Sequence, residues 1–152
     1  MKALELVRAA IAALCAAPVP VLAADDTRPQ PKLQASADEL PRPADEKLRA
    51  GMLQLRETVA ARVSDPAMDE AAQVALAGEI LRQVAMISEG RDFHSRPGRH
   101  LQWLLGDISD GAGLMRDAPR LQAKRLGLLR VAETLNFYGR EYDHPGWEPI
   151  RP

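Results

Sequence analysis

From residue 44 to residue 142, apolar residues recur at intervals of three and four in four successive segments. This spacing places the apolar side chains of each segment on one face of an α-helix. No segment alternates apolar and polar residues as a half-buried strand would. The pattern therefore predicts an all-α fold built from four helices of about 20 residues, each roughly 30 Å long.

The predicted helices span residues 44–63, 66–89, 97–116 and 118–142. Their connections are short, so sequential helices should be antiparallel, and an up-down-up-down four-helix bundle follows. The residues predicted to face the core are, helix by helix, Leu48, Met52, Leu55, Val59 and Val63; Val74, Ala77, Leu81, Val84 and Ile87; Leu101, Leu104, Leu105, Ile108, Ala112 and Met115; and Leu121, Leu128, Val131, Leu135, Tyr138 and Tyr142.

Local signals set the predicted helix ends. Asp65 and Pro66 suit the N-cap and the first position of the second helix, and Gly90 suits its left-handed stop. The third helix contains Gly106, Gly111 and Gly113, each of which costs about 1 kcal/mol relative to alanine. These glycines predict either close backbone approach or a locally weak helix. Lys124, Arg125 and Arg130 form a basic strip, interpreted as the solvent face of the fourth helix.

Residues 1–23 have the order of a secretory signal peptide. Lys2 and Arg8 precede a short apolar run, and small residues lead to a cleavage position after Ala23 or Ala24. Pro18 and Pro20 interrupt the run well before the roughly 20 apolar residues of a membrane span. The chain is therefore predicted to be exported to the periplasm or secreted, with no stable membrane insertion after cleavage.

Residues 24–43 contain four prolines and few apolar side chains, which is typical of a flexible segment. The predicted organisation is thus a signal peptide (1–23), a Pro-rich flexible segment (24–43) and a four-helix bundle with an aromatic tail (44–152).

Charge and cysteine content exclude several functions. Removing residues 1–23 takes away Lys2, Arg8 and Glu5, which leaves 18 of the 20 basic and 20 of the 21 acidic residues, a net charge of −2. No nucleic-acid partner is expected from such a balance. Cys15 leaves with the signal, so disulfides and thiolate metal sites are excluded from the processed chain. A periplasmic protein partner and a homo-oligomer are both compatible with the sequence.

Three motifs carry a resemblance to a known family. They are Gly51–Leu55 in the first helix, Arg99-His100 with Leu104–Asp110 in the third, and Tyr138-Gly139-Arg140-Glu141-Tyr142 in the fourth. Together they resemble the cytochrome b562-like periplasmic four-helix bundles. The ending Asp143–Trp147 is also similar to that of a group of small exported bacterial proteins.

The family resemblance implies that Met52 corresponds to one axial ligand of a haem. The position of the family's second ligand, a histidine, holds Gly139 here, so the standard haem ligation is expected to be lost. A non-catalytic binding or accessory protein is the leading interpretation. The first alternative is a haem b electron carrier that uses Met52 and His144.

The predicted topology suggests a second alternative. The starts of helices one and three and the ends of helices two and four share one end of an antiparallel bundle, which we call the pole. Met86, His94, His100 and His144 all fall there. Imidazole and thioether groups suit copper, so these residues form a candidate copper site. Solvated histidines at helix ends explain the same residues without a metal.

The aromatic tail has a predicted structural role. Tyr138, Tyr142 and Trp147 are interpreted as a plug under the pole, with Pro145-Gly146 turning the chain so that the indole returns to the core. Asp107 and Asp110 lie one turn apart and are interpreted as a solvated face rather than as paired acid–base groups. No enzyme activity is predicted.

Overall fold

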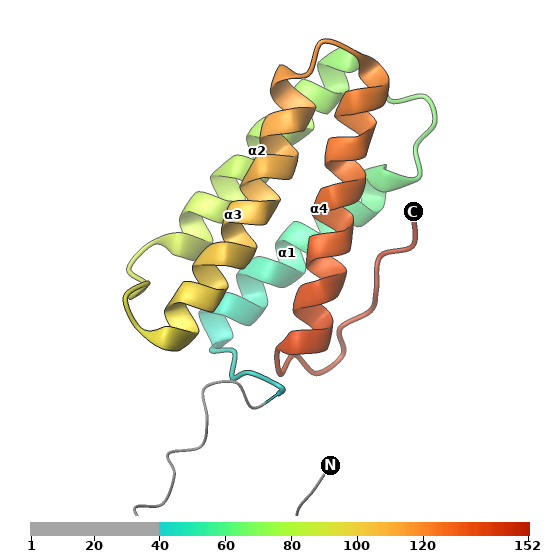
Figure 1. Cartoon of the computed structure of the whole chain (residues 1–152). Helices are drawn as coiled ribbons and strands as arrows, with labels where there is room; N and C mark the ends of the chain where they lie inside the picture. The colour runs from blue at the N-terminus through green and yellow to red at the C-terminus, as the bar shows by residue number, and fades with distance from the viewer. Residues whose placement is uncertain (1–39) are drawn as a thin grey trace, which may run out of the picture. The chain divides into compact units, whose positions relative to one another are not determined.

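The computed structural model describes residues 40–152. These residues form four helices, α1 (Glu46–Val63), α2 (Glu70–Ser88), α3 (Arg96–Asp117) and α4 (Leu121–Glu141) (Figure 1). Sequential helices pack on one another, and α1 also packs on α4, which closes the bundle. The predicted all-α four-helix bundle is confirmed. The predicted signal peptide (1–23), its cleavage site, Cys15 and most of the Pro-rich segment lie outside the described residues.

Side-chain caps define where three of the helices begin. Carboxylate oxygens of Asp45 and Asp69 accept hydrogen bonds from the backbone N–H groups three residues later, at 2.7 and 2.8 Å, and the Ser95 hydroxyl does the same at 3.1 Å. Such caps satisfy backbone donors that a helix start leaves without partners. None of the helices between residues 40 and 152 has the length and apolar character needed to cross a membrane.

The predicted start of α2 is wrong by four residues. The Asp65 carboxylate accepts a hydrogen bond from the N–H of Ala67, only two residues on, at 2.9 Å. This contact makes a tight turn instead of a helix start. Asp69 is the true N-cap, and α2 begins at Glu70.

The predicted core is confirmed in α1, except that Val63 is only partly buried, and it is corrected in α2. Leu48, Met52, Leu55 and Val59 of α1 are buried. In α2, Val74 is 37 % exposed, contrary to the prediction. The residues of α2 that are buried are Gln73, Leu76, Ala77, Ile80, Gln83, Val84 and Ile87. Two of these are glutamines. A prediction based only on apolar residues could not identify an inward face that begins with the polar residue Gln73, and it chose Val74 instead.

Close backbone approach explains one of the three glycines in α3. A Cβ atom on Gly111 would lie 2.8 Å from Cγ2 of Val131 and 3.0 Å from the carbonyl oxygen of Gly127 in α4. A Cβ atom on Gly127 would in turn lie 2.5 Å from the carbonyl oxygen of Gly111. Gly106 and Gly113 have no such neighbour within 4 Å among the described residues, so helix packing does not require glycine there.

Lys124 is buried rather than solvated, which corrects its predicted place on a solvent face. Its side chain is 2 % exposed, and Nζ donates hydrogen bonds to the carbonyl oxygens of Met115 and Arg116 at 3.1 and 2.8 Å. These are carbonyl groups of the last turn of α3, which lack partners within the helix. Lys124 therefore caps the end of α3 from within α4.

Candidate functional site

The C-terminal tail, residues 143–152, runs back along the seam between α1 and α4. The chain turns at Gly146, which has a φ of 79°, and then passes beside α4 (Figure 1). Asn136 of α4 holds the far part of the tail, because its side-chain amide donates to the carbonyl oxygen of Ile150 at 2.9 Å and accepts from the Ile150 N–H at 2.7 Å. As predicted, the chain turns at Gly146 and the indole of Trp147 packs against the core beside Tyr138. The residues after Trp147 were not predicted to continue along the seam.

The other wall of the seam is α1, which holds the tail through polar side chains. Arg49 donates to the backbone carbonyl and to the carboxylate of Asp143, at 2.9 and 2.8 Å. Arg56, two turns further along α1, donates to the backbone carbonyl of Glu148. The tail thus follows α1 in the direction away from the pole, and these hydrogen bonds hold it there.

Gly139 makes room for the indole of Trp147. A Cβ atom at position 139 would lie 2.1 Å from Cδ1 and 2.2 Å from Nε1 of Trp147. The ring of Tyr138 meets the same indole edge-on, with centroids 5.0 Å apart. Position 139, where the sequence resemblance would place a ligand histidine, is therefore covered by the protein's own tail.

The two residues of the haem hypothesis have separate environments. Met52 is fully buried in the core. His144 is half-buried in the turn after α4, and its Nδ1 lies 3.1 Å from the hydroxyl of Tyr138. The His144 ring also packs edge-on against Trp147 at 5.0 Å. A haem between Met52 and His144 stays a prediction, and the indole lies against the imidazole that would bind the iron.

The residues of the copper hypothesis differ in exposure and surroundings. His94 is exposed in the loop between α2 and α3, and Met86 on α2 is 62 % exposed. His100 packs among aromatic rings, with Tyr142 at 5.9 Å and Trp103 at 6.0 Å. Between residues 40 and 152, no group of three or more His, Cys, Asp or Glu side chains is arranged to hold a metal ion. The copper site stays a prediction.

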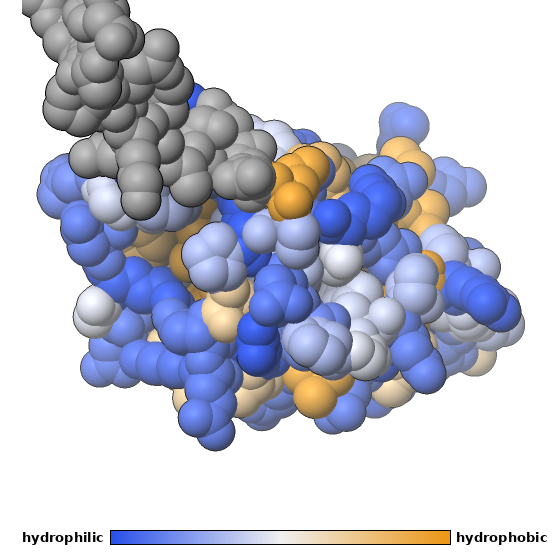
Figure 2. All heavy atoms as spheres, turned by 90° about the horizontal axis from the view of Figure 1, so that it is seen from below, coloured by the Kyte–Doolittle hydropathy of each residue, from blue (hydrophilic) through white to orange (hydrophobic). Residues whose placement is uncertain are grey.

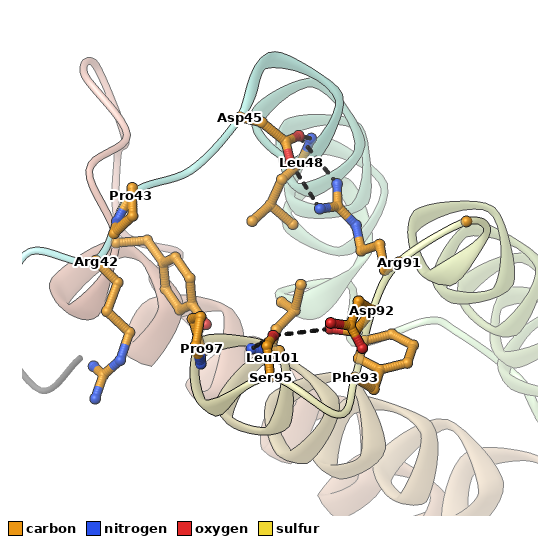
Figure 3. Close-up of a pocket in the computed structure, with 13 residues that line it drawn as sticks. Arg42, Pro43, Asp45, Leu48, Arg91, Asp92, Phe93, Ser95, Pro97 and Leu101 are labelled. Carbon is orange, nitrogen blue, oxygen red and sulfur yellow. Dashed lines mark hydrogen bonds and ion pairs between the residues drawn. The ribbon is translucent and has the colours of Figure 1, made fainter.

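A cavity of about 340 Å³ lies at the pole, between the starts of α1 and α3. Leu48 of α1 and Leu101 of α3 point toward one another across it, with Phe93 from the intervening loop nearby (Figure 3). Arg42 and Pro43, which precede α1, form a further side. The same end of the bundle is mostly hydrophilic on the outside, with apolar side chains visible between charged ones (Figure 2).

An ion pair joins two elements at the rim of the cavity. Arg91 in the loop after α2 donates two hydrogen bonds to the carboxylate of Asp45, at 2.8 and 3.1 Å (Figure 3). It also donates to the carbonyl oxygen of Ile87 at 2.7 Å, which fixes the loop to the end of α2. The hydrogen bonds from Arg91, with that from the N–H of Leu48, lower the pKa of Asp45 to about 2. The pair is thus ionised throughout the neutral range.

The segment before α1 is strapped to the end of α4. The N–H of Arg42 donates to the carbonyl oxygen of Glu141 at 2.7 Å, and the N–H of Asp143 donates to the carbonyl oxygen of Arg42 at 2.8 Å. The Arg42 guanidinium also pairs with the Glu141 carboxylate. Arg42 falls within the segment predicted to be flexible, but its backbone N–H and its carbonyl oxygen are both hydrogen-bonded to the end of α4.

Two residues that line the cavity, Arg42 and Tyr142, each have a buried polar atom without a partner among the described residues. The hydroxyl of Tyr142 and Nε of Arg42 are both buried without a hydrogen bond. Tyr142 as a whole is 6 % exposed, and burial raises the pKa of its hydroxyl to about 12, so the hydroxyl keeps its proton. The sequence pattern indicated that Tyr142 is buried, but no signal in it indicated that the hydroxyl lacks a partner.

No family model matches the chain, and neither a curated protein nor a solved structure matches it. The resemblance to the cytochrome b562-like bundles therefore depends on the three sequence motifs alone.

Proposed function

We propose that this chain is an exported, cytochrome b562-like bundle with a non-catalytic binding role, and that its binding site is the cavity at the pole. The supporting observation is that two residues lining that cavity, Tyr142 and Arg42, each have a buried donor without a partner, the Tyr142 hydroxyl and Arg42 Nε. Leaving a buried donor without a partner costs about 1–3 kcal/mol. A ligand that brings an acceptor to these groups recovers that free energy.

The lining of the cavity defines the class of ligand. Arg42 and Arg91 are balanced by Asp45 and Asp92, so the lining carries no net charge. The apolar floor of Leu48 and Leu101 suits a hydrocarbon part. A small molecule with an apolar body and one acceptor group, such as a carboxylate or an amide carbonyl, fits both features.

The Tyr142 hydroxyl is enclosed, so a ligand can reach it only if neighbouring residues move. We expect residues 42–43, which we call the strap, to shift slightly on binding. The strap is held by two backbone hydrogen bonds and one ion pair, a small set of contacts that can open locally. Binding should therefore be slower than diffusion allows, and it should change the environment of the backbone at Arg42.

The test uses the full chain, expressed with export and purified. Benzoate, benzamide and phenyl phosphate are titrated against it by NMR and calorimetry. At least one probe should perturb residues 42 and 142, and Tyr142→Phe should weaken its binding about tenfold, the loss of one hydrogen bond of about 1.4 kcal/mol. Ser109→Ala removes a hydroxyl elsewhere in the bundle and should leave the affinity unchanged. Equal binding by Tyr142→Phe, or no binding of any probe, would refute the proposal.

A further inference from the structure

The aromatic residues of this chain are concentrated at one end of the bundle. The sequence has two Trp, two Tyr and two Phe, and all except Phe93 belong to a single cluster of touching rings that also includes two of the three histidines. We call the continuous line through this cluster the aromatic path, which consists of Trp103, His100, Tyr142, Tyr138 and Trp147. Core packing alone does not require one such line in a protein with so few aromatic residues.

The rings of the aromatic path follow one another at short distances. Trp103, which is 57 % exposed, has its centroid 6.0 Å from that of His100, and His100 lies 5.9 Å from Tyr142. Tyr142 and Tyr138 stack at 4.8 Å with an interplanar angle of 21°. Tyr138 meets Trp147 at 5.0 Å. The path thus connects the protein surface at Trp103 with a fully buried tyrosine.

The Tyr138 hydroxyl faces a nitrogen of the His144 imidazole, and this nitrogen accepts the proton when the neutral ring carries its hydrogen on Nε2. The side chain is completely buried, and its oxygen lies 3.1 Å from Nδ1 of His144. Burial lowers the pKa of His144, and the positive charge of Arg49 lowers it further, so the imidazole is neutral at pH 7 and can accept a proton. Burial also raises the pKa of Tyr138, so the phenol does not release its proton in the resting state.

A phenol that loses one electron becomes a strong acid. If a base is already hydrogen-bonded to it, the proton moves as the electron leaves, and no charged phenol radical is trapped in the low-dielectric core. Tyr142, the other tyrosine of the path, has no partner for its hydroxyl among the described residues. The two buried tyrosines are therefore chemically different, and only Tyr138 is equipped for this step.

We infer that Tyr138 and His144 form a redox-active pair, in which an outer-sphere one-electron oxidant at the surface removes an electron from Tyr138 through the aromatic path while the phenolic proton moves to Nδ1 of His144. The O–H bond of Tyr138 breaks and an N–H bond on His144 forms. The products are a neutral tyrosyl radical, an imidazolium and the reduced oxidant. A one-electron donor reverses the step, and the proton then returns to Tyr138.

The test generates the oxidant by light in the presence of the purified full chain. The probe is a photo-oxidised ruthenium tris-bipyridine complex, with persulfate as the terminal acceptor, and radicals are trapped by rapid freezing and recorded by electron paramagnetic resonance. The wild type should give a neutral tyrosyl signal that is absent in Tyr138→Phe. His144→Gln can still accept a hydrogen bond but cannot take the proton, so it should lose most of the signal.

The exposed histidine provides the matched control. His94→Gln makes the same chemical change outside the aromatic path and should give the wild-type yield. A purely structural Tyr138–His144 hydrogen bond predicts the same radical yield in His144→Gln and His94→Gln, and that result would overturn the inference. A tyrosyl signal that persists in Tyr138→Phe would also overturn it. Circular dichroism of each variant checks that loss of signal is not loss of fold.

Discussion

The contact between Gly139 and Trp147 allows the effect of a single substitution, Gly139→Ala, on the free energy of unfolding to be predicted. Alanine at position 139 places its Cβ about where Cδ1 and Nε1 of the indole lie, at 2.1 and 2.2 Å, so the ring must leave its site. Trp147 is half-buried, so displacing it should cost about 2–3 kcal/mol, somewhat less than the roughly 3–5 kcal/mol lost when a fully buried Phe or Trp is truncated. Gly139→Ala should therefore destabilise the protein even though alanine favours helices.

The sign of this effect should reverse when the indole is removed. The three nearest atoms to a Cβ at position 139 all belong to Trp147, so Trp147→Ala removes the obstruction. In that background, Gly139→Ala should stabilise α4 by about 1 kcal/mol, the difference in helix propensity between the two residues. The expected coupling energy between the two positions is about 3 kcal/mol, at the upper end of values for residues in contact.

Urea unfolding followed by circular dichroism measures all four members of this cycle, with the free energy of unfolding extrapolated linearly. Gly106→Ala is the matched control, because Gly106 is an exposed helical glycine with no neighbour within 4 Å among the described residues. It should gain about 1 kcal/mol with or without Trp147. If Gly139→Ala has the same sign in both backgrounds, the tail does not lie against α4 as described.

Four further predictions concern other parts of the molecule. Lys124→Met removes the cap at the end of α3 and should lower the free energy of unfolding by about 1–3 kcal/mol, measured by urea unfolding. Tyr142→Phe should raise it by about 1 kcal/mol in the ligand-free protein, because a buried hydroxyl without a partner is removed; a lower value would mean that the hydroxyl is bonded. The lowered pKa of His144 means that the unfolded chain binds more protons, so stability should fall as the pH drops below about 6.5, and this loss should be smaller in His144→Gln. Haem added to the exported protein should give no Soret band that depends on both Met52 and His144, because Trp147 packs against that imidazole; absorption spectra of the wild type and the two alanine variants check this.

The regular part of the fold was predictable because it depends on local pattern. The face of α1 follows from apolar residues that lie in one heptad-like stripe, and Gly90 has the positive φ expected of a helix stop. Local rules could not predict the start of α2, because Asp65 and Asp69 are both good N-caps and Pro66 favours the wrong one. The inward position of Gln73 depends on its neighbours in the bundle rather than on its polarity.

The candidate sites depended more on tertiary contacts. Topology correctly indicated that the histidines gather at the pole, but it could not show that His100 and His144 are each enclosed by different aromatic rings. The sequence drew attention to Gly139 only through a family resemblance. That position 139 lies against an indole eight residues further along the chain could be seen only from the path of the tail.

The strap at Arg42 has a mechanical consequence. The backbone of Arg42 is bonded to residues on both sides of Tyr142, so the chain is fastened to the end of α4 four residues before α1 begins. Tension on the preceding chain therefore loads this clamp and α4 first, and the opening turn of α1 carries no force until the clamp breaks. A pulling force on the residues before Arg42 would therefore have to break these hydrogen bonds before it could unwind α1.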